Sequence, residues 1–254
     1  MNHLHSLLFV RGLPASTAQL RDALVTDPNY LHAVEEYCDS VYKEEVLLDT
    51  DSFVCTSCGS NNLVSVNIDS CKKPSRPVPK SQPTAVVIRC GDCGDAQCAQ
   101  ELIRAAALTV LDHSVSDDAA LWASLFRNDE PSFLAKEGPP PSCDATVRGA
   151  VISLKVLLTN YHDPHHRATC FKTGCGCCRF HYPKKCQKKT TIHSLLPDGA
   201  RIPLCDVPPD AIETVMAISI TSRRGKGSNF VNGYSPLMVR LAPTYDLRCS
   251  LCCM

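Results

Sequence analysis

Two short cysteine motifs of the form C-x-x-C-G constrain the fold of this chain more than any other feature. The first contains Cys55 and Cys58, and the second contains Cys90 and Cys93. A two-residue gap lets both thiolates of one turn reach the same ion at about 2.3 Å, and the glycine that follows tolerates the twist of that turn. Four such sulfurs close a tetrahedron around Zn²⁺. We therefore expect a structural zinc site, because a closed site leaves no position for a reactive water.

The cysteine content favours metal binding over a disulfide framework. The chain has 17 cysteines among 254 residues, an odd number that cannot pair completely into internal disulfides. A secretory signal is not expected, because the apolar residues 7–10 are followed at once by Arg11. The sequence has no run of about 18 uncharged apolar residues, so no membrane span is expected. We therefore expect a reducing compartment, nuclear or cytoplasmic, where clustered thiols bind metal.

Apolar patterning predicts an α+β fold, with an N-terminal zinc ribbon and helices followed by a small Cys/His-rich zinc module. Strands are expected at 63–68 and 84–89, on either side of a loop rich in proline and basic residues. Helical periodicity predicts further elements at 16–24, 96–111, 117–126 and 147–158. Trp122, the single tryptophan, is expected to lie in the core.

Consecutive prolines after Gly138 favour extended backbone and end any helix, which predicts a linker between two domains. The predicted division is an N-terminal segment at 1–45, a zinc ribbon plus two helices at 46–137, a proline linker at 138–143, and a Cys/His-rich basic region at 144–254.

Residues 162–189 hold a second concentration of cysteine and histidine within a strongly basic stretch. Seven basic residues against one acid give it a charge of +6, although the whole chain is neutral, with 26 basic and 26 acidic residues. We expect a second Zn²⁺ held by His166, Cys170 and Cys178, with His162 as the favoured fourth ligand. Other residues compete for these places, namely His165, Cys175, Cys177 and His181.

The same stretch predicts a nucleic-acid-binding surface, with a solvated face that only keeps the chain soluble as the alternative. Basic patches neutralise phosphates and release counterions, and aromatic rings among them stack on unpaired bases. Single-stranded DNA is therefore the favoured partner. The predicted contact residues are Arg167, Lys172, Arg179, Phe180, Tyr182, Lys184, Lys185, Lys188 and Lys189.

Two motifs of this half resemble Helitron-type transposon proteins and related PIF-type helicase proteins. The first is H-x3-C-F-K followed by C-R-F-x-Y-P, within residues 166–183. The second, at 229–241, is similar to the family's V-N-x-Y-N-P-x-L-L-x-L stretch, and the resemblance spans roughly residues 150–248. His181 departs from the family, which usually has glycine or asparagine there, and residues 244–249 replace its acidic continuation.

The resemblance implies a fragment or degenerate copy of the non-helicase portion of such a protein, with a helicase domain on a longer or a separate chain as a partner. A helicase motor needs the P-loop G-x-x-x-x-G-K-[ST], whose amides hold phosphates. The nearest string, at 223–228, lacks the first glycine and the Gly-Lys-Ser order. We therefore expect no ATPase motor here and assign no catalytic residue.

Two other functions stay open. The chain can be a protein-interaction module in which zinc only holds the fold. It can also be the remnant of a rolling-circle nuclease, which would need a metal-binding histidine pair and a tyrosine nucleophile such as Tyr161.

Overall fold

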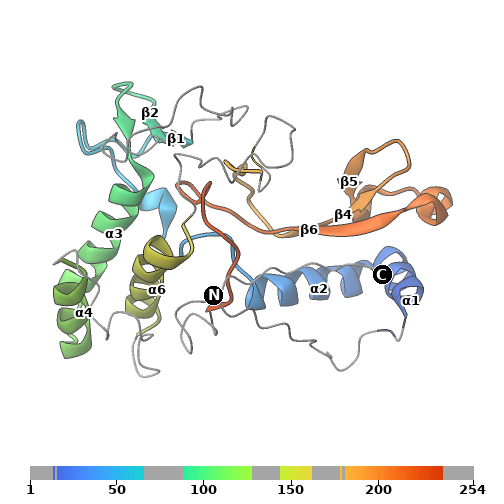
Figure 1. Cartoon of the computed structure of the whole chain (residues 1–254), viewed down its shortest axis with the longest axis horizontal. Helices are drawn as coiled ribbons and strands as arrows, with labels where there is room; N and C mark the ends of the chain where they lie inside the picture. Colours follow the sequence, from blue (N-terminus) through green and yellow to red (C-terminus); the bar gives the residue numbers. More distant parts are fainter. Residues whose placement is uncertain are drawn as a thin grey trace. The chain divides into compact units, whose positions relative to one another are not determined.

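The computed structural model describes residues 14, 16–65, 88–127, 144–161, 178 and 181–236. These residues divide into two units, of which the first holds the described parts of 1–38 and 190–221, and the second those of 39–189 and 222–249. Each unit combines helices with one small antiparallel sheet (Figure 1). The predicted α+β class is therefore confirmed at the level of a mixed helix-and-sheet chain.

The first unit packs helices against one face of a three-stranded sheet. Helix α1 begins after Ser16, as predicted, and the Ser16 hydroxyl accepts a hydrogen bond from the Gln19 N–H at 3.2 Å. The sheet has the strand order β5-β4-β6, and its Ile192 and Ile218 pack with Leu24 and Leu31 of the helices. The elements are α1 (Thr17–Thr26), α2 (Pro28–Val41, whose last residues belong to the second unit), β4 (Thr191–Leu195), β5 (Arg201–Pro203), β6 (Ala217–Thr221) and the 3-10 helices η3 (Leu204–Asp206) and η4 (Pro209–Thr214).

Three helices of the second unit, α3, α4 and α6, lie side by side and share one hydrophobic cluster (Figure 1). Trp122 is only 6 % exposed within it and stacks on Phe126 at a centroid distance of 6.1 Å, which confirms its predicted core position. Helix α6 begins after Asp144, whose carboxylate accepts from the Thr146 N–H at 2.7 Å. The bounds are α3 (Ala99–His113), α4 (Asp117–Arg127) and α6 (Ala145–Thr159).

The second unit also contains a small sheet of order β1-β2-β3, and here one prediction is corrected. A helix was expected from residue 96, but Ala96–Gln97 form strand β3 and helix α3 begins only after Cys98. The reason is the turn that follows Cys90, which brings 96–97 back beside β2 so that their backbone groups join its ladder. The other strands are β1 (Leu63–Ser65) and β2 (Ile88–Cys90). The rest of the two predicted strands, residues 66–68 and 84–87, lies outside the described residues. A 3-10 turn, η1 (Thr50–Ser52), precedes the sheet.

The predicted domain division stays a prediction, since the proline linker at 138–143 lies outside the described residues. Helices on its two sides nevertheless belong to one unit, and Trp122 of α4 shares a cluster with Val151 of α6. None of the described helices combines the length and the apolar character that crossing a bilayer requires.

Replacing Trp122 tests this helical core. Trp122→Ala is expected to lower the free energy of unfolding by about 3–5 kcal/mol, because it empties a buried site between helices. Leu121, its neighbour on α4, is 50 % exposed, so Leu121→Ala is the matched control, with an expected change below about 0.5 kcal/mol. Urea unfolding followed by circular dichroism measures both, and equal losses would contradict the core position of Trp122.

Candidate metal centre

Four cysteine sulfurs of the second unit meet at one point. The sulfurs of Cys55, Cys58, Cys90 and Cys93 all lie within 4.8 Å of one another. The Cys55–Cys93 and Cys58–Cys90 sulfur distances are 3.7 and 3.6 Å. A tetrahedron with metal–sulfur bonds of about 2.3 Å has edges of about 3.8 Å, whereas a disulfide bond is about 2.05 Å. The predicted convergence is therefore confirmed, and these free thiols can hold a metal ion.

The two cysteine turns have the same backbone geometry. The Gly59 N–H donates to the Cys55 carbonyl at 2.8 Å, and the Gly94 N–H donates to the Cys90 carbonyl at 3.0 Å. Both glycines lie in the left-handed region, with φ of 73° and 74°. Because L side chains are strained there, the glycine after each C-x-x-C is the residue that lets the turn close.

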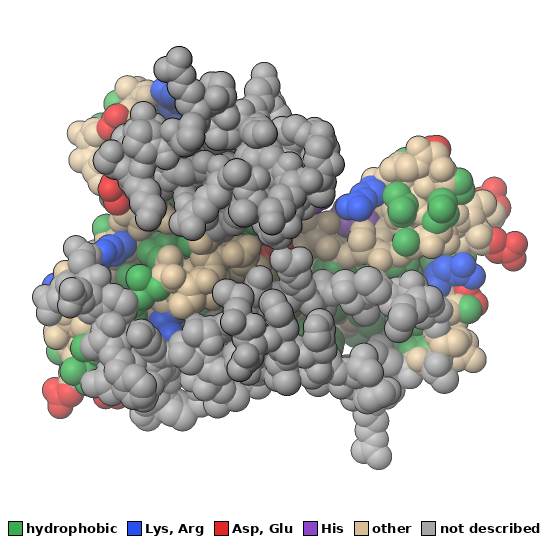
Figure 2. Space-filling model, in the orientation of Figure 1, with side chains coloured by type: hydrophobic (Ala, Val, Ile, Leu, Met, Phe, Trp, Pro, Cys, Tyr) green, Lys and Arg blue, Asp and Glu red, His purple; other side chains and the backbone are tan. Residues whose placement is uncertain are grey.

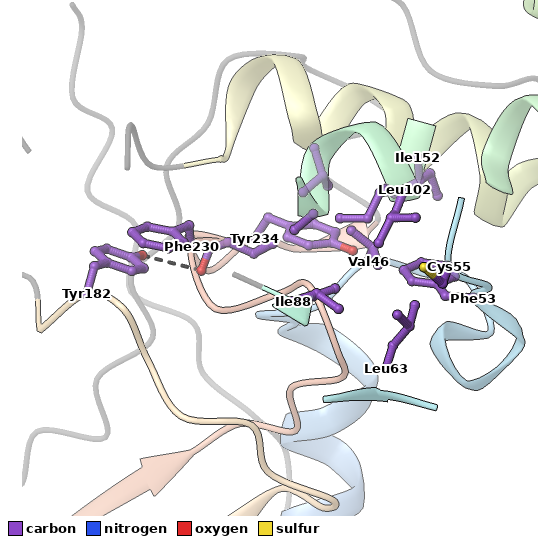
Figure 3. Close-up of a cluster of buried hydrophobic side chains, with 14 of the residues drawn as sticks. Val46, Phe53, Cys55, Leu63, Ile88, Leu102, Ile152, Tyr182, Phe230 and Tyr234 are labelled. Atoms are coloured by element: carbon purple, nitrogen blue, oxygen red, sulfur yellow. Dashed lines mark hydrogen bonds between the residues drawn. The ribbon is translucent and has the colours of Figure 1, made fainter. Parts of the chain in front are cut away.

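Each turn contributes one buried and one exposed cysteine. Cys55 and Cys90 are 1 % exposed, and Cys58 and Cys93 are exposed. The two buried cysteines belong to a hydrophobic cluster that contains Phe53, Leu63 and Ile88, and Figure 3 shows Cys55 beside Phe53 at its edge. One half of the cysteine cluster is therefore part of the core, and the other half faces solvent.

Two aspartates bridge the turns without using the sulfurs. Asp92 of the second turn accepts hydrogen bonds from the Ser60 hydroxyl and, at 2.7 Å, from the Asn62 amide. Asp95 accepts from the Ser57 hydroxyl of the first turn. The Ser60 and Asn62 bonds lower the pKa of Asp92, and the Ser57 bond lowers that of Asp95, because both favour the ionised carboxylate. These carboxylates hold the two turns against each other.

The pKa values of the Cys90 and Cys93 thiols are shifted in opposite directions. The backbone N–H groups of Cys93 and Asp92 lower the pKa of the Cys90 thiol to about 7, because they donate to its thiolate. The Asp95 N–H acts in the same sense on Cys93, but desolvation and the neighbouring sulfurs outweigh it and raise the pKa of Cys93 to about 12. Negative charge on several sulfurs at once is therefore disfavoured. A bound cation would remove this repulsion.

Of the four ligands predicted for the second metal site, the structure describes only Cys178. Cys178 is 1 % exposed and lies in the same hydrophobic cluster as Cys55 and Cys90. The other predicted ligands, His162, His166 and Cys170, lie outside the described residues. Within the part of the chain that the structure describes, the four-cysteine cluster is the one group with metal-binding geometry. A second zinc stays a prediction.

The structure corrects the expected role of Tyr182, which was predicted to stack on a base. Its side chain is 4 % exposed, and its ring lies against that of Phe230 (Figure 3), with a centroid distance of 6.0 Å. Its hydroxyl donates to the Asn232 side-chain oxygen at 2.5 Å. Burial of an aromatic ring is favourable, and here it leaves no open face for a base. Four further predicted contacts lie outside the described residues, namely Arg167, Lys172, Arg179 and Phe180.

Lys184 also has an internal partner, which the sequence analysis missed. Its ammonium pairs with Glu44 at 2.5 Å, and the buried guanidinium of Arg224 pairs with the other oxygen of the same carboxylate. Arg224 is 3 % exposed, and this burial lowers its pKa to about 10. Glu44 therefore holds the ammonium of Lys184, whose side chain is still 26 % exposed, and the predicted contact of Lys184 with DNA stays a prediction.

The remaining predicted lysines, Lys185, Lys188 and Lys189, are exposed on a firmly held segment. We call residues 184–189 the lysine strap. Its backbone pairs with 224–229: the Lys184 N–H donates to the Asn229 carbonyl at 2.9 Å, and Gln187 and Arg224 exchange bonds of 3.0 and 2.9 Å. On the face drawn in Figure 2, charged side chains of both signs are scattered over the described residues, so positive charge there is not gathered into one broad patch.

Tyr161, the candidate nuclease tyrosine, is also a packing residue. Its hydroxyl donates to the Gly227 carbonyl at 3.2 Å, and its ring stacks on Phe230 at 6.2 Å. Desolvation raises the pKa of its phenol, which disfavours the phenolate that a nucleophile would need.

The two motifs that carry the Helitron resemblance meet in the structure, since Tyr182 of the first packs on Phe230 of the second. His181 has a φ of 57°, in the left-handed region that favours glycine and asparagine, the residues usual in the family. No protein-family model, no curated protein and no solved structure matches this chain. The resemblance therefore stays a prediction.

Cobalt(II) titration tests the four-cysteine centre. Cobalt added to the reduced, metal-free chain is expected to give the intense visible absorption of tetrahedral thiolate coordination. Cys58→Ser should weaken that binding by about tenfold or more, because it removes one of the four ligands. Cys205→Ser, which alters an exposed thiol of the other unit, is the control and should leave it unchanged. Equal spectra for all three proteins would contradict the assignment.

Proposed function

We propose that the four-cysteine centre binds Zn²⁺, that strands β1, β2 and β3 with their two turns form a zinc ribbon, and that the chain binds single-stranded DNA. The donor set supports the choice of ion. Four thiolates suit Zn²⁺, whereas Mg²⁺ and Ca²⁺ prefer oxygen ligands. With all four positions filled by protein sulfurs, the ion would have a structural role rather than a catalytic one.

Zinc would stabilise the second unit by linking elements that pack weakly on their own. Strands β1, β2 and β3 have three, three and two residues, so their ladder alone contributes little. The ion would join the Cys55 turn to the Cys90 turn, and both buried cysteines continue into the hydrophobic cluster. Because a site of this kind forms only in the folded chain, the free energy of metal binding adds to the stability of the fold.

The lysine strap carries the DNA proposal. It presents the exposed Lys185, Lys188 and Lys189 from a backbone segment that is paired with residues 224–229. Side chains on a fixed segment lose less conformational freedom on binding than side chains on a free one. A lysine ammonium contacts phosphate as a point charge and carries no base preference. We therefore propose binding that depends on the DNA backbone more than on its sequence.

The zinc centre and the strap are connected through one core. Tyr182, two residues before the strap, belongs to the same hydrophobic cluster as Cys55 and Cys90. The predicted contacts outside the described residues, among them Arg167 and Lys172, would extend the same basic segment. The Helitron resemblance favours the same ligand, a nuclear location, and a helicase domain on a longer or a separate chain as partner.

A zinc-stabilised protein-interaction module is the second candidate. Val54 and Val64 are 51 % and 56 % exposed, and both lie next to the cysteine cluster in the sequence or on its sheet. Apolar side chains of this kind suit a protein partner better than phosphates. This candidate predicts zinc binding without any affinity for DNA.

Binding of labelled oligonucleotides over a salt series separates the two candidates. We expect single-stranded DNA to bind at about 50 mM salt and the affinity to fall steeply as salt rises, because phosphate contacts release counterions. The variant Lys185→Gln/Lys188→Gln should bind about tenfold more weakly, with a salt slope reduced by about 0.7 for each lysine that contacts phosphate. Fluorescence anisotropy measures both quantities.

The matched control is Arg127→Gln/Arg201→Gln, which removes the same amount of charge from exposed residues outside the strap. It should leave the affinity and the salt slope near those of the unmodified chain. The absence of DNA binding at about 50 mM salt would reject the DNA proposal. Equal effects of the two variants would reject the strap as the binding surface.

A further inference from the structure

We propose that the four-cysteine centre is also an oxidation site, at which hydrogen peroxide converts the four thiolates into two disulfides that cross between the turns, Cys55–Cys93 and Cys58–Cys90. The release of an ion in this reaction rests on the proposed zinc. The disulfide pairing rests on the arrangement of the sulfurs, and DNA binding has no part in it.

The exposure of the cysteines determines where an oxidant can act first. Cys58 and Cys93 are exposed, whereas Cys55 and Cys90 are buried in the hydrophobic cluster. Peroxide from solvent therefore reaches one sulfur of each turn. Reactive thiols of redox-sensitive sites are accessible and lie beside a second thiol that resolves the oxidised form.

The sulfur contacts determine which cysteine resolves which. Exposed Cys58 lies 3.6 Å from buried Cys90, and exposed Cys93 lies 3.7 Å from buried Cys55. Each contact joins an accessible sulfur to a buried one of the opposite turn. Each pair would have to approach by about 1.6 Å to reach the length of a disulfide bond.

Side-chain bonds that do not involve the sulfurs would keep the turns together while the ion leaves. Ser60 and Asn62 of the first turn donate to Asp92, and Ser57 donates to Asp95. Thr56 donates to the Gln97 side-chain oxygen at 2.6 Å, which adds a further bridge between the two sides. These contacts favour bond formation across the turns.

The chemistry balances with peroxide as the oxidant. An exposed thiolate attacks one peroxide oxygen, so that a sulfur–oxygen bond forms, the oxygen–oxygen bond breaks, and the hydroxide that leaves takes up a proton as water. The buried thiolate then attacks this sulfenic acid, forming the disulfide and releasing a second hydroxide that is protonated to water. The formation of each disulfide removes two electrons from a pair of thiolates, and these electrons reduce one peroxide to two waters.

Oxidation would remove the metal ligands. A thiolate is the form of cysteine that binds metal, and both sulfurs of a disulfide have lost that negative charge. Two peroxides would therefore release one ion from each centre. Thiol–disulfide exchange with a reductant would restore the thiolates and the binding of the ion.

The test treats the zinc-loaded, full-length chain with hydrogen peroxide. A chromogenic chelator measures the released zinc, and mass spectrometry of peptides, after free thiols are blocked, identifies the linked cysteines. We expect zinc release in step with the appearance of peptides linked through Cys55–Cys93 and Cys58–Cys90, and reversal of both by a dithiol reductant. Cys186→Ser/Cys205→Ser, which removes two exposed thiols elsewhere, should release zinc at the same rate.

Links within a turn, Cys55–Cys58 or Cys90–Cys93, would overturn the proposed pairing. Zinc release without disulfides among these four cysteines would overturn the oxidation site. Untreated protein that holds no zinc under reducing conditions would instead reject the proposed zinc function, and peptide mapping of the peroxide-treated chain would still decide the pairing.

Discussion

The meeting of four cysteine sulfurs is the constraint on which the second unit depends. The sulfurs lie within 4.8 Å of one another and project from turns at the ends of very short strands. So much negative charge in one place is unfavourable unless protons or a cation neutralise it. Because Cys55 and Cys90 are also members of the hydrophobic cluster, neutralising the sulfurs and packing the core stabilise each other.

Some residues of the basic segment 182–189 make contacts within the second unit, and others are exposed. Tyr182 packs on Phe230, and Lys184 pairs with Glu44 beside buried Arg224, so these residues hold the segment in place. A buried ion pair adds little net stability, but breaking it would leave an unpaired charge, so it favours one arrangement of the chain. The strap lysines beyond Lys184 are left exposed and can meet a partner.

Local patterns predicted the parts of the fold whose causes are local. The C-x-x-C-G spacing predicted the cysteine cluster, because turn geometry alone places the two sulfurs of each pair, and helical periodicity predicted α4 and α6. Strand β3 was missed because it depends on pairing with β2. The partner of Lys184 was missed because Glu44 lies 140 residues away, a distance over which residue type and spacing carry no signal.

We propose that metal binding completes the core of the second unit. Hydrogen exchange of the backbone amides, measured with zinc bound and after its removal by a chelator under reducing conditions, tests it most directly. We expect the removal of zinc to abolish protection in β1, β2 and the first turn of α3, the elements that adjoin the cysteine turns. Unchanged protection of these amides without metal would contradict it.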